Sequence, residues 1–199
     1  MQSEKLICDF VGGPVGHRLK FGGGRGQALP KAAGFTKGRT PTIIDATAGL
    51  GRDSFLLASL GAKVTLIERS KEMHRLLSEG LGRAKTTGTP YDEIIARMTL
   101  IFGDARELLE NLTAEVILID PMHPDRGNSA LVKKEMRQIR EIVGPDLDAE
   151  TLVLTALTRA TKRVVLKWPA KVDSLPGLPE PSHRIAGKTT RYDVFMIHD

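Results

Sequence analysis

Ile43-Ile44-Asp45-Ala46-Thr47-Ala48-Gly49-Leu50-Gly51-Arg52-Asp53, residues 43–53, joins a short apolar run to an acid and a glycine-rich turn. The apolar pair predicts a strand that ends at Asp45, and the residues after the turn predict a helix over 52–60. Glycines let the backbone approach a ligand closely, and the helix that follows presents free N–H groups to it. The turn is not a dinucleotide-binding fingerprint, because an acid precedes its first glycine by four residues and no third glycine follows in register.

Strands and helices alternate along the rest of the chain. Further strands are predicted over residues 64–67, 99–102, 116–119, 163–166 and 192–197. Helices are predicted to begin after the N-cap residues Ser70, Asp92 and Asp148, and another over residues 129–143. This order predicts an α/β, Rossmann-like fold whose mostly parallel central sheet has helices on both faces. Ligands bind at the carboxyl ends of the strands in such sheets, so the residues after each strand are the candidates for function.

The composition is that of one globular domain. The chain has 199 residues, of which 41% are hydrophobic and 27% charged. No apolar run approaches the ~20 residues that a membrane helix needs. The single cysteine, Cys8, excludes an internal disulfide and favours a reducing cytoplasm. We therefore expect a cytoplasmic protein with no membrane or metal partner.

The first forty residues are basic and rich in glycine. Their basic residues include His17, Arg18, Lys20, Arg25, Lys31, Lys37 and Arg39. We expect residues 1–40 to form a basic Gly-rich N-terminal arm and residues 41–199 to form the Rossmann-like domain. Such an arm suits a polyanionic partner, and a solvated tail that serves solubility is the alternative.

Acidic residues follow the second and third strands as well. In Glu68-Arg69, the carboxylate could accept hydrogen bonds from both hydroxyls of a ribose. In Gly103-Asp104-Ala105, the acid could accept from the exocyclic amine of an adenine. Either acid alone could be part of a surface ion pair. Together with the turn at residues 43–53, they are typical of the cofactor site of Rossmann-like methyltransferases.

The fourth strand is followed by Asp120-Pro121-Met122-His123-Pro124. Amino methyltransferases that act on bases carry Asn or Asp, a proline and an aromatic residue at this place. The carboxylate of Asp120 and the carbonyl of Pro121 could accept the N–H groups of an exocyclic amine and align its lone pair with the methyl group. His123 could stack on the extruded base. A plain Asp-Pro turn after a strand is the alternative.

The chain resembles the bacterial ribosomal RNA small subunit methyltransferase J family, whose members methylate a guanine N2 in 16S ribosomal RNA. The resemblance runs from about Asp9 to the C-terminus. It is carried by Asp9-Phe10-Val11-Gly12-Gly13, His17-Arg18, Lys20-Phe21-Gly22-Gly23-Gly24-Arg25-Gly26, residues 45–53, Glu68-Arg69, Asp120-Pro121-Met122, residues 129–136, residues 143–148 and residues 160–165.

The resemblance implies S-adenosylmethionine as the cofactor and direct methyl transfer as the reaction. It implies cofactor contacts at Arg52, Asp53, Glu68, Arg69, Asp104, Ala105 and Asp120, to which the turn adds Asp45, Gly49 and Gly51. Two features depart from the family's pattern. Family members usually have phenylalanine where this chain has His123, and they usually carry a further N-terminal segment of several tens of residues.

The expected partner is small-subunit ribosomal RNA, either free or within the assembled 30S subunit. Candidate phosphate contacts are Lys20, Arg25, Lys133, Lys134 and Lys167, although Lys133 and Lys134 would equally suit a solvated helix face. Three alternatives stay open on the residues alone: a methyltransferase of this fold for another RNA, a protein or a small molecule; a non-catalytic RNA-binding module; and a nicotinamide oxidoreductase, which the missing third glycine disfavours.

Overall fold

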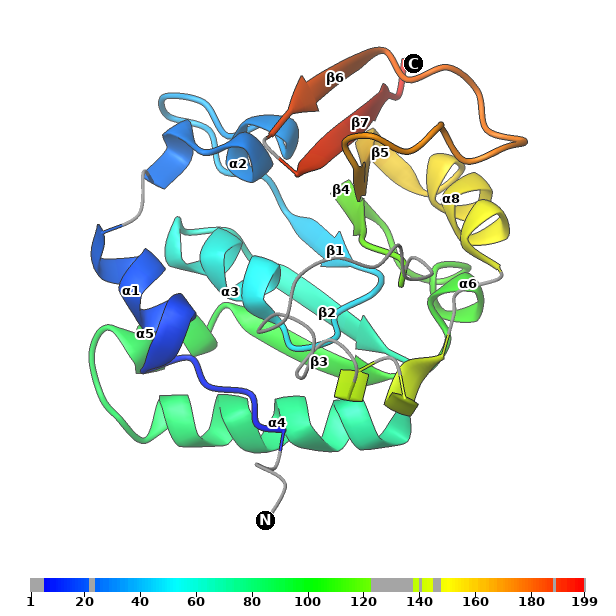
Figure 1. Ribbon diagram of the computed structural model, residues 1–199. Helices are drawn as coiled ribbons and strands as arrows, with labels where there is room; N and C mark the ends of the chain where they lie inside the picture. Colours follow the sequence, from blue (N-terminus) through cyan, green and yellow to red (C-terminus); the bar gives the residue numbers. More distant parts are fainter. Residues whose placement is uncertain are drawn as a thin grey trace.

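The fold is a seven-stranded sheet between two layers of helices (Figure 1). The computed structural model describes residues 6–21, 24–122, 138–139, 141–144, 148–187 and 189–198. The strands are β1 (Ile43–Asp45), β2 (Val64–Glu68), β3 (Met98–Phe102), β4 (Ala114–Ile119), β5 (Ala160–Pro169), β6 (His183–Ala186) and β7 (Thr190–Met196). The helices are α1 (Gly13–Phe21), the 3-10 turn η1 (Gly24–Gly26), α2 (Ala28–Ala32), α3 (Arg52–Ser59), α4 (Lys71–Lys85), α5 (Tyr91–Ile95), α6 (Ala105–Leu108) and α8 (Ala149–Leu157).

The order of the strands places a ligand crevice at the middle of the sheet. The order is β3-β2-β1-β4-β5-β7-β6, with β1 to β5 parallel and β7 antiparallel to both of its neighbours. From β1 the chain builds outward through β2 to β3, and from β4 it builds outward on the other side. The direction therefore reverses between β1 and β4, which is where open α/β sheets bind ligands. The predicted mostly parallel sheet is confirmed.

Helices cover both faces of the sheet, as the continuous apolar run in β4 predicts. Val116 and Leu118 pack in the core layer that includes side chains of α3, α4 and α5. Ile117 and Ile119, which point the other way, pack in the layer that includes α6 and α8. All four side chains are buried.

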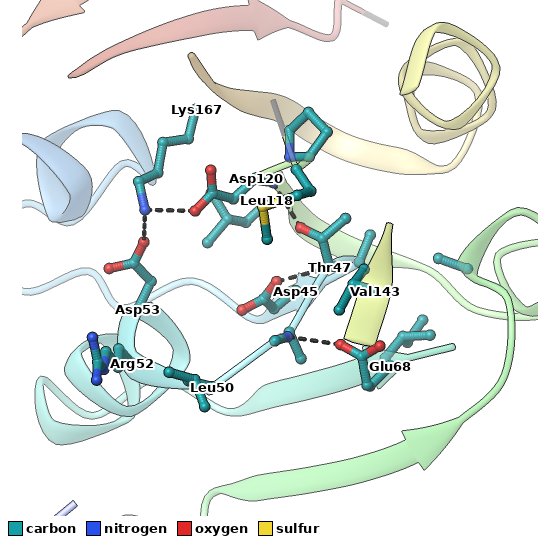
Figure 2. Close-up of a pocket in the computed structure, with 18 of the residues that line it drawn as sticks. Asp45, Thr47, Leu50, Arg52, Asp53, Glu68, Leu118, Asp120, Val143 and Lys167 are labelled. Atoms are coloured by element: carbon teal, nitrogen blue, oxygen red, sulfur yellow. Dashed lines mark hydrogen bonds and ion pairs between the residues drawn. The ribbon is translucent and has the colours of Figure 1, made fainter. Parts of the chain in front are cut away.

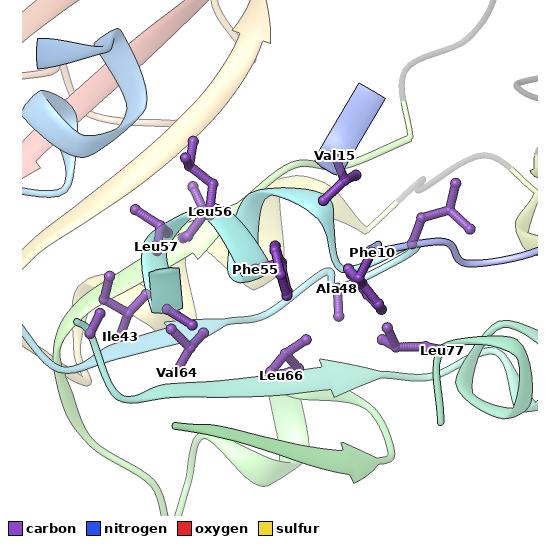
Figure 3. Close-up of a cluster of buried hydrophobic side chains, with 14 of the residues drawn as sticks. Phe10, Val15, Ile43, Ala48, Phe55, Leu56, Leu57, Val64, Leu66 and Leu77 are labelled. Carbon is purple, nitrogen blue, oxygen red and sulfur yellow. The ribbon is translucent and has the colours of Figure 1, made fainter. Parts of the chain in front are cut away.

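The N-terminal segment packs on the domain. We expected residues 1–40 to form an arm beside it, and the described part of this range places apolar side chains in the first core layer. Phe10 is buried and stacks on Phe55 of α3, with 4.9 Å between ring centroids (Figure 3). Val15, Leu29 and Phe35 are buried in the same layer. The basic composition concealed these apolar residues, which gain free energy by leaving water.

Helices α1, α2 and α6 were not predicted, and several predicted elements differ locally from the structure. Ser70 caps α4, since its hydroxyl accepts from the Met73 N–H at 3.4 Å. Asp92 does not cap α5, because it lies inside the first turn. Asp148 precedes α8 but makes no side-chain capping bond. Strand β6 was not predicted because this short edge strand is mostly exposed and lacks alternation. The helix predicted over 129–143 lies mostly outside the described residues.

Gly51 is a position where the fold requires glycine, so Gly51→Ala should destabilise the protein. Its φ is +68°, and an added Cβ would lie 2.7 Å from Cδ1 of Leu77 and 3.3 Å from the ring of Phe10. We expect the free energy of unfolding to fall by roughly 2–4 kcal/mol, from the left-handed conformation and the overpacked core together. Urea denaturation measures it. Gly82→Ala in α4 is the control, because its Cβ would meet nothing within 4 Å and should leave stability unchanged or raise it. Equal stabilities for the two variants would contradict the argument.

Candidate active site

A cavity of about 520 Å³ opens at the carboxyl ends of the central strands (Figure 2). Its volume is in the usual range for small-molecule sites. Every residue predicted to bind the cofactor lines it: Asp45, Gly49, Gly51, Arg52, Asp53, Glu68, Arg69, Asp104, Ala105 and Asp120. Pro121 and Lys167 line it as well. The sheet therefore brings together in space the strand ends that were singled out along the chain.

The acid at the end of β1 holds the glycine-rich turn. Asp45 is buried, its Oδ2 accepts from the Ser54 hydroxyl at 2.6 Å, and its Oδ1 accepts from the Thr47 N–H at 3.2 Å. Burial raises the pKa of Asp45 to about 7, against the opposing effect of these hydrogen bonds. Nearby Asp53 and Asp120 act in the same direction as burial. Asp45 is therefore a structural acid whose charged form is costly in the folded protein.

Asp45→Asn should become more favourable to stability as pH rises. Between the ordinary pKa of 3.8 and the folded value of about 7, the folded protein holds a proton that the unfolded chain has lost. Stability therefore falls as pH rises through this window, and an asparagine removes that fall. Urea denaturation from about pH 5 to about pH 8 should show the free-energy difference shifting in favour of the variant. Asp173→Asn on the exposed surface is the control, and the same pH trend in both variants would remove Asp45 as its source.

Glu68 fastens the end of β2 to the glycine-rich turn. This carboxylate is 5% exposed; Oε2 accepts from the Gly49 N–H at 2.8 Å and Oε1 from the Ser70 N–H at 2.7 Å. A carboxylate has about four acceptor positions, so it can accept from ribose hydroxyls while the backbone holds it. Gly49 has φ +52°, and an added Cβ would meet only one atom within 4 Å, the Thr47 carbonyl oxygen at 3.9 Å. The turn thus leaves room beside an anchored acceptor, which suits a nucleoside-type cofactor.

A network of two arginines and two aspartates forms the edge of the cavity beyond β2 and β3. Arg106 donates to both carboxylate oxygens of Asp104, at 3.0 and 2.6 Å, and these bonds hold the pKa of Asp104 below its ordinary value. Arg69 lies 2.6 Å from Asp148 and 3.9 Å from Asp104. Asp148, interpreted from the sequence only as a helix cap, therefore belongs to the site, because its side chain binds these arginines rather than the helix.

A lysine joins the turn after β4 to the first turn of α3, which follows the glycine-rich turn. The Asp120 N–H donates to the Thr47 hydroxyl at 2.7 Å. Nζ of Lys167, on β5, donates to Oδ2 of Asp120 at 2.6 Å and to Oδ2 of Asp53 at 2.7 Å. Burial opposes the charge of Lys167, but the two carboxylates outweigh it and raise its pKa above the ordinary value. The predicted phosphate contact is thus an internal cation of the cavity.

Comparison with known proteins agrees with this geometry. The family model described as "Putative SAM-dependent methyltransferase", SAM being S-adenosylmethionine, matches residues 1–197. The ribosomal RNA small subunit methyltransferase J of Agrobacterium fabrum is 65% identical over 98% of this chain and 94% of its own length. The corresponding protein of Brucella anthropi is 65% identical over 98% of this chain and 96% of its own length. The chain belongs to the ribosomal RNA small subunit methyltransferase J family.

Solved structures place this family member among S-adenosylmethionine-dependent methyltransferases. A SAM-dependent methyltransferase from Neisseria gonorrhoeae superposes with a TM-score of 0.76 and 35% identity, covering 98% of this chain and 76% of that chain. The predicted family, fold class and cofactor are confirmed, and the chain is an S-adenosylmethionine-dependent methyltransferase. When bound, the cofactor supplies an electrophilic methyl group on its sulfonium sulfur. Glu68 and the turn around Gly49 are the groups of this chain that would hold it.

The remaining predicted residues of this methyltransferase divide into two groups. Arg25 is engaged within the protein: its guanidinium donates to the carbonyls of Thr36 and Arg39 at 2.8 and 3.1 Å, and to the Thr40 hydroxyl at 2.7 Å. This geometry favours a structural role for Arg25 over a phosphate contact. His123, Lys133, Lys134 and the side chain of Lys20 lie outside the described residues. Their predicted roles stay predictions.

Sequence reasoning missed the wall that α1 supplies to the cavity. Val15, Arg18 and Leu19 line it, and Arg18 lies 3.7 Å from Asp53. The signal was available, since His17-Arg18 is part of the resemblance, but its charge was interpreted as part of a basic arm.

Trp168, the chain's only tryptophan, lies in the second core layer and donates from Nε1 to the Asp173 carbonyl at 2.8 Å.

Neither a metal centre nor a membrane span emerges from the part of the chain that the structure describes. There, no three His, Cys, Asp or Glu side chains gather as metal ligands would. The helices found in the same residues are all too short or too polar to cross a bilayer.

Proposed function

We propose that this protein transfers a methyl group from S-adenosylmethionine to the N2 exocyclic amine of a guanine in 16S ribosomal RNA, in the cytoplasm. The observation that carries the proposal is the position of Asp120-Pro121. The turn lies at the end of β4, where the sheet order reverses, and it lines the same cavity as the residues suited to the cofactor. The relatives named ribosomal RNA small subunit methyltransferase J support the choice of substrate.

The chemistry of an exocyclic amine explains why an acid and a proline suit this turn. The amine is a poor nucleophile because its lone pair is delocalised into the ring. The Asp120 carboxylate can accept one N–H and the Pro121 carbonyl the other, which directs the lone pair at the methyl group. The carboxylate also stabilises the positive charge that develops on the nitrogen. Proline has no N–H to compete for the carboxylate.

The outer contacts to the RNA belong to the proposal. Lys20, Lys133 and Lys134 are the predicted phosphate contacts that the geometry leaves open. Arg18 on α1 adds a cation at the cavity, with a side chain 48% exposed. The base would have to leave its helix to reach Asp120, which favours an extruded or single-stranded guanine.

Labelled methyl transfer tests the proposal. Wild-type protein and tritiated cofactor are incubated with one of three substrates: free 16S RNA, 30S subunits or total cell protein. The RNA and the subunits come from cells that lack the protein. The expected product is N2-methylguanosine at one position of the RNA, located by mass mapping, and the better RNA substrate tells free RNA from assembled subunit. Label in protein, or in a nucleoside other than N2-methylguanosine, would overturn the proposal.

A further inference from the structure

We propose that Lys167 is a positioning residue for methyl transfer. By binding Asp53 and Asp120 at once, it ties the start of α3, beside the cofactor cavity, to the turn after β4. The inference rests on the proposed function, because it assigns Asp120 the task of orienting the amine. Lys167 itself acts through Asp120 rather than on the substrate.

The register of the sheet places the two residues side by side. Ile119 of β4 pairs with Leu166 of β5 in the parallel ladder, so the next residue of each chain segment is Asp120 and Lys167. The ammonium then reaches across to Asp53 in the first turn of α3. Figure 2 shows the lysine above the cavity with its Nζ between the two carboxylates. One side chain thus links three elements at the point where cofactor and base would meet.

The positive charge of Lys167 lies among acidic side chains that would otherwise repel one another. Asp45, Asp53 and Asp120 bring three carboxyl groups to one side of the cavity, and Asp53 and Asp120 both raise the pKa of Asp45. Arg18 lies 3.7 Å from Asp53, further than the 2.7 Å that separates Lys167 from the same residue. Without the ammonium, the carboxylates of Asp53 and Asp120 would repel each other, and Asp120 would lose the short contact that directs its Oδ2.

A purely structural role does not explain a lysine here. The side chains of Lys167 and Asp53 are mostly buried, and an ion pair withdrawn from water is often worth no more to stability than a well-packed apolar side chain of similar volume. Lys167 is also poorly suited to act as a general base, because its two carboxylate partners keep its side chain protonated. Tyr192 of β7, which pairs with Lys167 across the ladder, adds no charge near neutral pH, since burial raises the pKa of its phenol to about 12. What Lys167 contributes is a fixed positive charge between two carboxylates.

The test compares Lys167→Met, Lys167→Gln and Lys167→Arg with wild type. The neutral variants should lower kcat by on the order of tenfold to a hundredfold, with KM for the RNA nearly unchanged, because a small misplacement of an orienting group acts on the transition state. They should also move the acid limb of the kcat–pH profile to higher pH, since the carboxylates lose a neighbouring cation. Lys167→Arg keeps the charge and should keep the wild-type pH limb. Lys171→Met, an exposed lysine just beyond β5, is the matched control.

Thermal denaturation and calorimetric binding of the cofactor show which variants are folded. One folded neutral variant, Lys167→Met or Lys167→Gln, is enough for the test. A folded neutral variant with wild-type kcat and pH limb overturns the inference. The inference is also overturned if the neutral variants and Lys167→Arg lose kcat alike and none of them shifts the pH limb, because that pattern reports packing. These outcomes are separate from failure of the proposed function, in which wild-type protein itself gives no N2-methylguanosine. In that case the same comparison is made on the substrate that wild type does methylate.

Discussion

Asp120→Ala should lower the rate of methyl transfer by on the order of 10²- to 10³-fold, the loss typical when one preorganised group is removed from a developing charge. In the proposed mechanism, the alanine takes away the acceptor that orients the amine and the negative charge that balances the nitrogen. It also leaves the Lys167 ammonium with Asp53 as its remaining carboxylate partner at hydrogen-bond distance among the described residues. Single-turnover kinetics with saturating cofactor measure the chemical step, and filter binding measures RNA affinity, which should change far less.

Two comparisons separate chemistry from binding in this variant. Asp120→Asn keeps an amide oxygen that still accepts, so it should retain more activity than the alanine. Calorimetry with S-adenosylmethionine checks the cofactor, because Asp120 lines the same cavity. Glu110→Ala, an exposed carboxylate after α6, is the control for loss of charge alone. A normal single-turnover rate for Asp120→Ala would remove this carboxylate from the mechanism.

Glu68→Ala should weaken S-adenosylmethionine binding by about tenfold to a hundredfold. A hydrogen bond to a charged group is worth roughly 1.5–3 kcal/mol, and each 1.4 kcal/mol is about tenfold in affinity. The variant loses the proposed charged acceptor for the ribose and also the acceptor of the Gly49 N–H, which holds the turn. Both losses act in the same direction. Isothermal titration calorimetry measures the change directly.

Stability must be followed alongside, because Glu68 is buried and binds two backbone N–H groups. Glu68→Gln separates the effects: it keeps one acceptor oxygen and the shape of the side chain, so it should hold the turn better than the alanine while binding the cofactor more weakly than wild type. Glu93→Ala on α5, exposed and remote from the cavity, is the control. Unchanged cofactor affinity in a folded Glu68→Ala protein would take this residue out of the ribose site.

The sequence was sufficient for the parallel part of the sheet and for much of the cavity, because both depend on local patterns. Each parallel strand contains a short apolar run, and the run over residues 116–119 in β4 indicated burial on both faces. In a parallel sheet, the residues that follow each strand come to one edge whatever the loop lengths between them. Asp45, Glu68, Asp104 and Asp120 could therefore be assigned to one site before their distances were known.

Roles that depend on partners far along the chain could not be assigned in the same way. Lys167 and Arg25 were both interpreted as phosphate contacts because they are cations in a basic chain. Lys167 finds its partners 114 and 47 residues away, and Arg25 contacts backbone up to 35 residues away. Asp148 binds Arg69 across 79 residues. A side chain's charge is visible in the sequence, but what neutralises that charge is not.

The sequence by itself determined the order of the parallel strands β1 to β5, the glycine-rich turn after β1 and the acids at the strand ends. Tertiary structure alone decided that α1 would wall the cavity, that Phe10 would enter the core and that one lysine would hold two carboxylates together. The physical reason is the range of the forces involved. Hydrophobic periodicity and backbone turns are fixed within a few residues, whereas burial and ion pairing depend on which distant surfaces the folded chain brings into contact.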